Sequence, residues 1–521
     1  NSMAGGQGIS DRSRESGEVK LKLAELAKHL EPSLAAGLGG KWEVDAVDVT
    51  HDSRQSGPGI VFVAIRGEVT DGNQFVAAAV AGGAAAIVSE QPAPPDAGAP
   101  WIQVRNARAA LAQASAAVHD HPSRKLKLGG ITGTNGKTTT AHLVDSIIRE
   151  AEGVSAMLGT ITYRIGAESA EAHHTMPESS DIQRFLARAL RAGCRSAALE
   201  VSSHGIELNR ADELSFAAAV FTNLTRDHLD YHKTMEAYFG AKKKLFDGSL
   251  GAVPKCCIVN IDDEYGRRLA ELARGTVVTY GLRAGDVKAE EFVLGPTGIE
   301  MTARLSDGST HLSSPLVGRP HVYNILAAAA TGMALGFDSP VIARGISRCP
   351  IVPGRFEQVT LGQPSKVNFR VVVDYAHTDD ALKNVLQTAR EIVRKRGRVI
   401  TVFGCGGDRD RSKRAPMGEA AGRLSDVVIV TSDNPRSEDS EAIIRDIEPG
   451  IETSGRPYVK VLDRRQAIFR AIEEARSGDV VVIAGKGHET YQIIGGLKAH
   501  FDDREVARDA LSQRALRENR S

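Results

Sequence analysis

The sequence predicts an α/β protein of several domains whose sheets are mostly parallel. Two observations indicate this fold class. Around residue 130 a short apolar run leads into a glycine-rich loop and then into a helical pattern. After residue 353 the order of strand, loop and helix recurs several times. A chain of 521 residues is also too long for one ordinary core, so more than one domain is expected.

The first block of the chain spans residues 19–124. It contains short strand candidates at 60–65 and 84–88, and it ends in a polar stretch with a proline, 119–125, which is typical of a linker. Residues 1–18 contain no apolar signal core. We expect them to be a disordered leader or tag.

The second block, residues 125–352, begins with the strand before the glycine-rich loop. Runs of small and apolar residues at 196–202, 217–222 and 256–260 have the length of buried strands, and helical patterns lie between them. Buried strands that alternate with helices are typical of a parallel sheet.

The third block, residues 353–521, starts near Pro353 and repeats strand, loop and helix. Its strand candidates are 369–374, 399–404, 426–431 and 479–484. The polar or glycine-containing segments at their ends are Asp374–His377, Gly404–Asp410, Ser432–Arg436 and Gly485–Glu489. Ligands of open α/β sheets bind at the carboxyl ends of the strands, so we expect these segments to form a binding site.

The composition argues against several classes of protein. Lysine plus arginine and aspartate plus glutamate both number 65, so no net charge attracts nucleic acid or an acidic membrane. The five cysteines lack paired spacing, which argues against disulfides or a zinc site and for a reducing compartment. No apolar stretch has the ~18 residues of a transmembrane helix. We therefore expect a cytoplasmic protein that binds neither nucleic acid nor membrane.

The glycine-rich loop is the most informative feature of the chain. Gly133 and Gly136 allow backbone N–H groups to turn toward phosphate oxygens, at the positive end of the following helix. Lys137 can reach terminal phosphates, and the Thr138 hydroxyl can bind Mg²⁺. The predicted ATP-binding residues are Gly133, Thr134, Asn135, Gly136, Lys137, Thr138 and Thr139. The alternative is an ordinary strand-to-helix turn, because Ile131 stands where such loops usually begin with glycine.

Seven motifs follow one another along the chain. They are Asp52–Arg54, Gly133–Thr139, Glu200–His204, Thr222–His232, Asp374–His377, Asp433–Arg436 and Gly485–Glu489. In this order and spacing they resemble the Mur ligases, the ATP-dependent amide-forming enzymes of peptidoglycan precursor synthesis. The resemblance covers about residues 45–505. It implies a UDP-substrate domain (19–124), a central P-loop ATPase (125–352) and a C-terminal Rossmann-like domain that binds the amino acid (353–521).

The resemblance also implies a reaction. ATP would phosphorylate a carboxylate of UDP-N-acetylmuramoyl-L-alanyl-D-glutamate, and the amine of meso-diaminopimelate would attack the acyl phosphate. A site for this chemistry must position ATP and two anionic groups and neutralise their charge. We expect small-molecule partners only, and a monomer.

Several residues of the central block acquire roles from the resemblance. The implied catalytic residues are Lys137, Glu200, His228 and Lys242. Two Mg²⁺ sites are expected, with Thr138, Glu200, His228 and Lys242 as ligands, Lys242 as a carbamate (N6-carboxylysine). Without the resemblance, the run of three lysines around Lys242 would be taken as a solvated helix face.

Further ATP contacts are expected from Asn324, Arg355 and Asp374. This chain has His321 where the family often has asparagine, and Asp379 where it usually has proline.

The UDP-linked substrate is expected between the first two domains. Ser53 and Arg54 resemble the uridine-diphosphate end of its site, and Thr175, Ser202 and Arg210 match residues that hold the sugar and peptide. Hydroxyls and a guanidinium suit phosphate and carboxylate recognition. The chain departs from the family nearby, at Met176 and Leu208.

The tetrapeptide Asp433–Arg436 indicates the amino acid that is added. In the family it accompanies meso-diaminopimelate, whose second carboxylate an arginine fork can bind through two hydrogen bonds. Lysine lacks that carboxylate and would leave Arg436 unpaired. The expected contacts are Arg409, Asp433, Asn434, Arg436, Gly485 and Glu489, with Glu489 on the distal ammonium.

Three alternatives remain open. Lysine or another diamino acid could be the acceptor, although Arg436 argues against lysine. A folylpolyglutamate synthetase or a ligase that adds D-alanyl-D-alanine would leave Asp433–Arg436 unexplained. A nucleotide-dependent switch without amide chemistry would retain the P-loop but has no need of Glu200, His228 and Lys242.

Overall fold

The computed structural model describes residues 21–30, 41–67, 70–362, 367–393 and 397–520. The expected leader, 1–18, lies outside these residues. The chain divides into two compact units, residues 1–122 and 123–521.

Unit 1 is built on a four-stranded parallel sheet in the order β3-β4-β5-β6. Its strands are β3 (Asp48–Thr50), β4 (Ile60–Val63), β5 (Ala86–Ser89) and β6 (Trp101–Gln103). Its helices are α1 (Leu23–Leu30), α2 (Val76–Ala81) and α3 (Ala107–Val118). The short strands β1 (Leu21–Lys22) and β2 (Asp45–Ala46) pair with each other in a separate sheet. Residues alternate along β4, so Val61 and Val63 pack with α1 and α3, whereas Phe62 packs with α2. Both predicted strands of this block are confirmed.

The larger sheet of unit 2 has 11 strands in the order β10-β9-β8-β11-β7-β12-β13-β14-β15-β16-β17. They are β7 (Lys127–Thr132), β8 (Ala156–Leu158), β9 (Thr162–Ile165), β10 (Glu168–Glu171), β11 (Ser196–Glu200), β12 (Phe216–Phe221), β13 (Cys256–Asn260), β14 (Thr276–Gly281), β15 (Val287–Gly295), β16 (Gly298–Leu305) and β17 (Gly308–Ser314). The strands from β8 to β15 in this order are parallel, as predicted, and those beyond them at each end are antiparallel.

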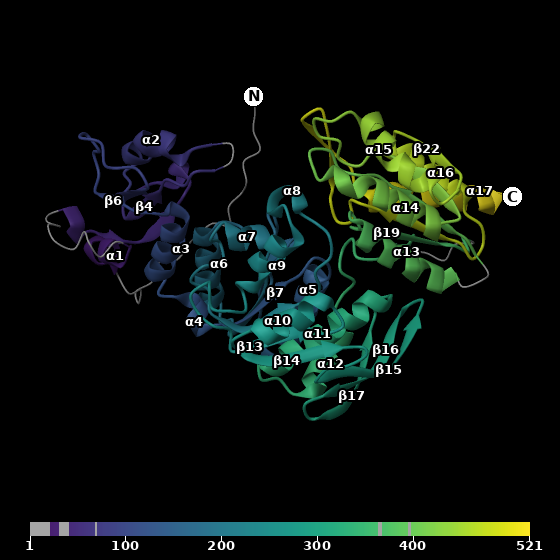
Figure 1. Ribbon diagram of the computed structural model, residues 1–521, viewed down its shortest axis with the longest axis horizontal. Coiled ribbons are helices and arrows are strands. Elements are labelled where there is room, and N and C mark those ends of the chain that lie inside the picture. Colours follow the sequence, from purple (N-terminus) through teal and green to yellow (C-terminus); the bar gives the residue numbers. More distant parts are fainter. Residues whose placement is uncertain (1–20, 31–40, 68–69, 363–366, 394–396, 521) are drawn as a thin grey trace. The chain divides into compact units, whose positions relative to one another are not determined.

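Helices cover both faces of this sheet, and each face has its own core. The helices are α4 (Pro122–Lys125), α5 (Lys137–Glu152), α6 (Ser179–Arg191), α7 (Ser203–Glu207), α8 (Leu229–His232), α9 (Met235–Lys243), α10 (Glu264–Leu272), α11 (Arg319–Ala334) and α12 (Ser339–Ser347). One core contains the apolar residues of α5, α11 and α12, and the other those of α6, α9 and α10. Figure 1 labels β15, β16 and β17 in the ribbon beside α12.

The second sheet of unit 2 has six strands in the order β18-β19-β23-β20-β21-β22, parallel except for β18. Its strands are β18 (Glu357–Val359), β19 (Arg370–Asp374), β20 (Val399–Phe403), β21 (Val427–Val430), β22 (Tyr458–Lys460) and β23 (Val480–Ala484), and a hairpin follows as β24 (Tyr491–Ile494) and β25 (Leu497–His500). The helices are α13 (Asp379–Val393), α14 (Arg414–Leu424), α15 (Ser440–Glu452), α16 (Arg464–Glu474) and α17 (Asp503–Arg520). The four strands predicted after residue 353 are confirmed, and the sheet with helices on both faces is Rossmann-like.

All five cysteines are free, and burial raises the pKa of each thiol. Cys194, Cys257, Cys349 and Cys405 are buried, and Cys256 is half-buried. In the part of the chain that the structure describes, no helix combines the length and the apolar character needed to cross a bilayer.

Candidate functional site

One cavity of about 510 Å³ in unit 2 collects the predicted nucleotide residues. Residues from both sheets line it: the loop Thr134–Thr139, then Thr160, Thr175, His228, Asn324, Arg355, Asp374 and others. The loop follows β7, at the centre of the parallel sheet. Thr160, His228 and Asp374 follow or end other strands, Asn324 lies on α11, and Arg355 precedes β18. A cavity at the carboxyl ends of parallel strands is where a ligand is expected in such sheets.

The glycines of the loop are required by its geometry. Gly133 has φ of 146° and Gly136 has φ of 89°. A Cβ at Gly133 would collide with the Thr222 hydroxyl, and one at Gly136 would collide with the side chain of Asn324. α5 begins directly after Gly136, so its first N–H groups face the cavity side of the loop.

The Lys137 ammonium lies inside the curve of the loop. Its Nζ donates to the carbonyl oxygens of Gly133 at 2.9 Å and of Thr134 at 3.0 Å. Burial lowers its pKa, while the nearby carboxylates of Glu200 and Asp227 act in the opposite direction. The cation therefore stands at the place where a nucleotide's terminal phosphates would be held.

Glu200 links Thr138 of the loop to Thr160, and through Thr160 to Thr175. It is the last residue of β11 and is 1% exposed. One carboxylate oxygen accepts from the hydroxyls of Thr138 at 3.0 Å and Thr160 at 2.9 Å, and the other from the Thr160 N–H at 2.8 Å. Thr160 in turn contacts Thr175, with 3.1 Å between the two hydroxyl oxygens.

This cluster fits a magnesium ion. The Thr138 hydroxyl and the Glu200 carboxylate are hard oxygen ligands within hydrogen-bonding distance of each other, beside the glycine-rich loop. Mg²⁺ is commonly held by one or two such protein oxygens, together with phosphate oxygens and water. Within the described ranges, no three side chains of His, Cys, Asp or Glu are grouped so as to hold a metal ion.

His228 has the left-handed φ of 55°. Its N–H donates to Asp227 Oδ1 at 2.9 Å, and its Nε2 lies 3.3 Å from Asp227 Oδ2. Burial is the main cause that lowers the pKa of this imidazole. A neutral ring can offer a nitrogen lone pair to a metal.

Lys242 is buried, unlike the two lysines that follow it. It is 1% exposed, and its Nζ donates to the Gly133 carbonyl at 3.0 Å and lies 4.6 Å from the centre of the Tyr238 ring. Burial and the Lys137 cation lower its pKa well below the usual value. Lys243 and Lys244 instead pair with Asp247 and Glu207 at the surface. The interpretation of the lysine run as a solvated helix face therefore fails for Lys242.

Lys242 and His228 both lie around Tyr238, whose ring centre is 6.0 Å from that of His228. As an ammonium, Lys242 offers only donors and cannot ligate a metal. The second metal site therefore fits these residues only if Lys242 carries a carboxylate.

Asn324, on α11, packs against Gly136 of the glycine-rich loop (the P-loop, Gly133–Thr139). Its Oδ1 accepts from the Thr140 hydroxyl at 3.4 Å, and its Nδ2 is 3.2 Å from Nδ1 of His321. The histidine that departs from the family thus pairs with the asparagine. Burial lowers the pKa of His321 to about 4, so the ring is neutral at physiological pH.

Arg355 and Asp374 bring the second sheet to the cavity. Arg355 Nη2 donates to the Thr138 hydroxyl at 3.0 Å, and its guanidinium lies over the ring of Tyr375. The Asp374 carboxylate accepts from the N–H groups of Phe356 at 2.6 Å and Ala376 at 2.8 Å. Burial raises the pKa of Asp374 to about 6.

The residues predicted for the UDP-linked substrate occur in both units. In unit 1, Ser53 begins a single helical turn capped by Asp52, and the exposed Arg54 forms an ion pair with Asp52 at 2.7 Å. In unit 2, Ser202 caps α7, and Arg210 pairs with Glu178 at 2.6 Å.

The two departures from the family in this region leave the Arg210 contacts intact. Arg210 Nη1 donates to the main-chain oxygen of Met176 at 2.9 Å, which any residue could supply. Leu208 is exposed.

The third group of predicted residues meets at the carboxyl ends of β21 and β23. Asn434 Nδ2 donates to Glu489 Oε2 at 2.8 Å, and Asp433 Oδ1 accepts from the Asn434 N–H at 2.7 Å. Gly485 has φ of 116°, and a Cβ there would collide with the Asp433 carboxylate. Burial and Asp433 raise the pKa of Glu489.

Arg436 has the left-handed φ of 55°, which the adjacent hairpin holds. Its N–H donates to Ile493 O at 3.0 Å, and its carbonyl accepts from Gly495 N at 2.8 Å. The side chain reaches Gly407 O at 2.7 Å, and the exposed Arg409 lies on the same loop. Backbone strain of this kind persists where the surrounding structure fixes it, often at binding sites.

Three family domains match the chain: the Mur ligase family catalytic domain over residues 47–119, the Mur ligase middle domain over 131–332, and the Mur ligase glutamate ligase domain over 354–487. A UDP-N-acetylmuramoyl-L-alanyl-D-glutamate--2,6-diaminopimelate ligase of Solibacter usitatus is 48% identical over 496 residues, which are 95% of this chain and 98% of that protein. The chain belongs to the Mur ligase family.

Other similar proteins agree. The ligase of the same name from Geobacter metallireducens is 46% identical over 513 residues, covering 95% of this chain and 99% of that one. A solved structure of a 2,6-diaminopimelate ligase of this name superposes with a TM-score of 0.67 at 32% identity, covering 95% of this Mur ligase and 99% of that chain. As a Mur ligase, the protein is an ATP-dependent amide-forming enzyme of peptidoglycan synthesis.

Sequence reasoning missed several polar residues of this Mur ligase's cavity. Thr160 contacts Glu200, and Asp380, at the start of α13, accepts from Asn135 Nδ2 at 2.9 Å. Asp379, the departure from proline, pairs with Arg226 at 3.2 Å, and α13 begins at that residue. Neither Thr160 nor Asp380 belongs to a recognisable motif; only their closeness to a strand end or helix start could have indicated them.

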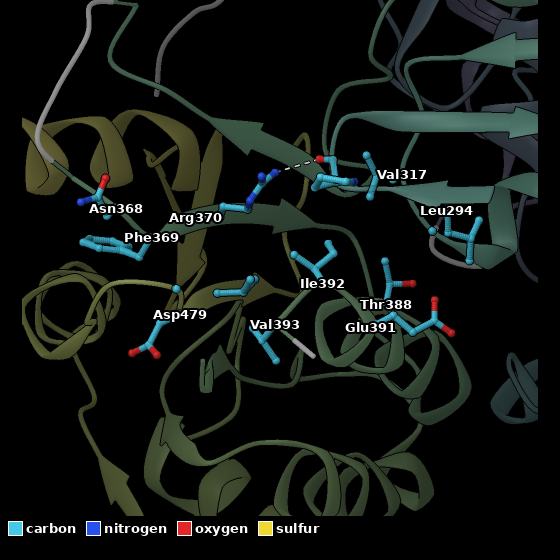
Figure 2. A pocket seen from close by; sticks show the side chains of 15 residues that line it. Leu294, Val317, Asn368, Phe369, Arg370, Thr388, Glu391, Ile392, Val393 and Asp479 are labelled. Atoms are coloured by element: carbon cyan, nitrogen blue, oxygen red, sulfur yellow. Dashed lines mark hydrogen bonds between the residues drawn. The ribbon is translucent and has the colours of Figure 1, made fainter. Parts of the chain in front are cut away.

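A larger cavity of about 730 Å³ lies elsewhere in unit 2 of the Mur ligase (Figure 2). The turn after β15, α13 and the starts of β19 and β23 line it, and Arg370 donates across it to Pro296 O at 2.8 Å. It contains none of the predicted site residues and lies at the amino ends of β19 and β23. In α/β sheets of this kind the opposite ends of the strands bind ligands, so size does not identify the site here.

Proposed function

We propose that this Mur ligase joins meso-diaminopimelate to UDP-N-acetylmuramoyl-L-alanyl-D-glutamate, with conversion of ATP to ADP and phosphate. One observation carries the choice of acceptor: Asp433, Asn434, Arg436 and Glu489 form one cluster at the ends of β21 and β23. The proteins that are 46–48% identical to the chain bear the name of this activity.

The proposed reaction has two steps. The carboxylate of the UDP-linked substrate attacks the γ-phosphorus of ATP, which gives an acyl phosphate and ADP. The amine of the acceptor then attacks the acyl carbon, loses a proton and releases phosphate. The protein mainly orients the groups and neutralises their charge.

In this proposal the P-loop residues Gly133–Thr139 hold the phosphates of ATP. Lys137 exchanges its two carbonyl contacts for phosphate oxygens, and Arg355 supplies a second cation at the same place. Asn324 and Asp374 line the same cavity and would contact the rest of the nucleotide.

Two magnesium ions would supply further charge neutralisation. Thr138 and Glu200 would hold one, and His228 and a carbamylated Lys242 the other. The buried, depressed-pKa amine of Lys242 supports carbamylation, because only a neutral amine reacts with carbon dioxide.

The acceptor would be recognised at both of its ends. Arg436 and Arg409 offer cations to the distal carboxylate, and Glu489 and Asp433 offer carboxylates to an ammonium. Lysine has no distal carboxylate, so it would leave Arg436 without its partner. Thr175, Ser202 and Arg210, together with Ser53 and Arg54, would hold the UDP-linked substrate. We further propose that the enzyme is a cytoplasmic monomer.

The test is phosphate release from ATP by purified protein with the UDP-linked substrate, comparing meso-diaminopimelate with L-lysine at equal concentration. Turnover with diaminopimelate alone supports the proposal. Turnover with lysine would retain the ligase chemistry and refute the acceptor. No turnover with either would refute the reaction as written.

A further inference from the structure

Lys486 is a buried cation within the acceptor cluster that the proposed reaction does not use. It follows Gly485 at the end of β23 and is 0% exposed. Its Nζ lies 3.2 Å from Glu489 Oε2 and 3.4 Å from Asn434 Oδ1, and it also donates to the main-chain oxygen of Tyr491. The ammonium therefore joins three segments: the Asp433–Arg436 turn, the Gly485–Glu489 loop and the start of β24.

Lys486 and a main-chain N–H together determine which way the Asn434 amide faces. An ammonium carries only donors, so it can meet only the amide oxygen. That oxygen also accepts from the Ile493 N–H at 3.0 Å. The Nδ2 group is consequently directed toward Glu489, at 2.8 Å.

Lys486 also balances charge around Glu489. The Glu489 carboxylate lies near Asp433, and both Asp433 and burial raise its pKa, whereas Lys486 opposes them. The other buried cation nearby, Arg464, is engaged by Asp503 at 2.7 Å and lies 4.0 Å from Asp433. Among the ion pairs that the structure describes, the cation in direct contact with Glu489 is therefore Lys486.

We propose that Lys486 is a positioning residue for the acceptor amino acid, whose ammonium fixes the Glu489 carboxylate and the Asn434 amide in the orientation that binds it. The complete burial of Lys486 means that it acts through these two residues and does not touch the acceptor. The proposal rests on the proposed function in one respect, which is that the acceptor binds at Asn434 and Glu489.

A burial cost supports this assignment. A buried lysine is expensive, and a well-packed apolar side chain is often at least as stable at such a position. The two side chains that Lys486 contacts are both expected to bind the acceptor. Ordering of the site therefore explains the presence of this buried cation better than stability does.

The test is steady-state kinetics of Lys486→Met, with Lys498→Met as the matched control. Lys498 lies on β25 over the same Tyr491 ring, at 3.9 Å, but is exposed. Loss of hydrogen bonds to a charged group should raise KM for diaminopimelate about 10-fold or more in Lys486→Met. KM for ATP and for the UDP-linked substrate should stay unchanged, as should all constants of Lys498→Met.

Two further variants separate positioning from simple loss of folding. Lys486→Arg keeps a cation and its donors, and it should recover part of the acceptor affinity. If Lys486 acts through Glu489, then Lys486→Met combined with Glu489→Gln should raise the acceptor KM by less than the product of the two single effects. Equal increases in all three KM values, or fully multiplicative effects, would overturn the proposal.

Wild-type turnover distinguishes this proposal from the one it rests on. If the wild type uses another amino acid, the same comparison is made with that acceptor, and a selective rise in its KM still supports the role of Lys486. If the wild type turns over diaminopimelate and Lys486→Met leaves its KM unchanged, the role of Lys486 fails while the proposed function stands.

Discussion

At the scale of single residues, burial separates Lys242 from its neighbours in the same run. Three consecutive lysines on a helix are commonly solvated, yet the first of them reaches the main-chain oxygen of Gly133 in the P-loop. The helical spacing explains the difference, because α9 turns Tyr238, Ala241 and Lys242 inward and Lys243 outward.

We expect Lys242→Ala to lose ligase activity by about 10²-fold or more, because a buried charge-bearing group is removed from beside the loop that is proposed to hold the phosphates. Sodium bicarbonate should not restore the activity of this variant. Phosphate release is the measurement, and Lys243→Ala, which loses only a surface pair with Asp247, is the control. Retained activity in Lys242→Ala would contradict the carbamate.

Arg436 offers a second prediction at this scale. Arg436→Ala should lower kcat/KM for diaminopimelate by about 10²-fold, since several kcal/mol are lost with a buried charged pair. Arg423→Ala, on the exposed side of α14, should leave the kinetics unchanged. An unchanged KM and kcat in Arg436→Ala would exclude the arginine from acceptor binding.

At the scale of elements, the loop after β23 depends on a glycine that no side chain can replace without a shift. Gly485 combines a positive φ of 116° with an Asp433 carboxylate oxygen 2.3 Å from where a Cβ would stand. A Cβ at position 485 would therefore strain the loop that brings Lys486 and Glu489 to the Asp433–Arg436 turn.

Gly485→Ala should raise KM for the acceptor and lower the melting temperature. The strain of a positive φ and the collision of the new Cβ with the Asp433 carboxylate would both destabilise the loop. The control is Gly496→Ala in the β24–β25 turn, where φ is 79° but no atom lies within 4 Å of the added Cβ. That variant should show only the strain of about 1–2 kcal/mol. Kinetics and thermal melting of both variants provide the comparison, and equal behaviour would show that the collision is unimportant.

The strands that sequence patterns predicted well are the buried parallel ones. Short apolar runs ending in glycine or polar residues, such as 399–404, are visible because both faces of the strand are covered. The antiparallel ribbon β15–β17 was not predicted. β16 alternates buried and exposed residues, so its apolar content is diluted along the sequence.

In the candidate site, too, motifs that are contiguous in sequence could be predicted, whereas contacts between residues far apart in sequence could not. The P-loop and the Asp433–Arg436 turn are contiguous in sequence and could be recognised there. Thr160 and Lys486 could not be assigned, because their roles arise only when strand ends meet across a sheet. The burial of Lys242 likewise depends on packing against a loop more than 100 residues away.

At the scale of the whole molecule, the predicted nucleotide residues all lie in unit 2, whereas Ser53 and Arg54 lie in unit 1. A fragment that begins at Ser123 should therefore bind Mg·ATP with an affinity close to that of the full chain, yet form no amide. Nucleotide titration and phosphate release measure the two properties. Loss of ATP binding in a folded fragment would show that unit 1 contributes to the nucleotide site.

The distribution of the cysteines provides a chemical means of following one unit by itself. All five thiols belong to unit 2, where burial raises their pKa values and shelters all but the half-buried Cys256. An alkylating reagent reacts with the thiolate, so labelling of the native enzyme should be slow and should accelerate when unit 2 opens. The rate of alkylation would then report the unfolding of unit 2 alone, because all of the cysteines lie in that unit. No engineered probe would be needed.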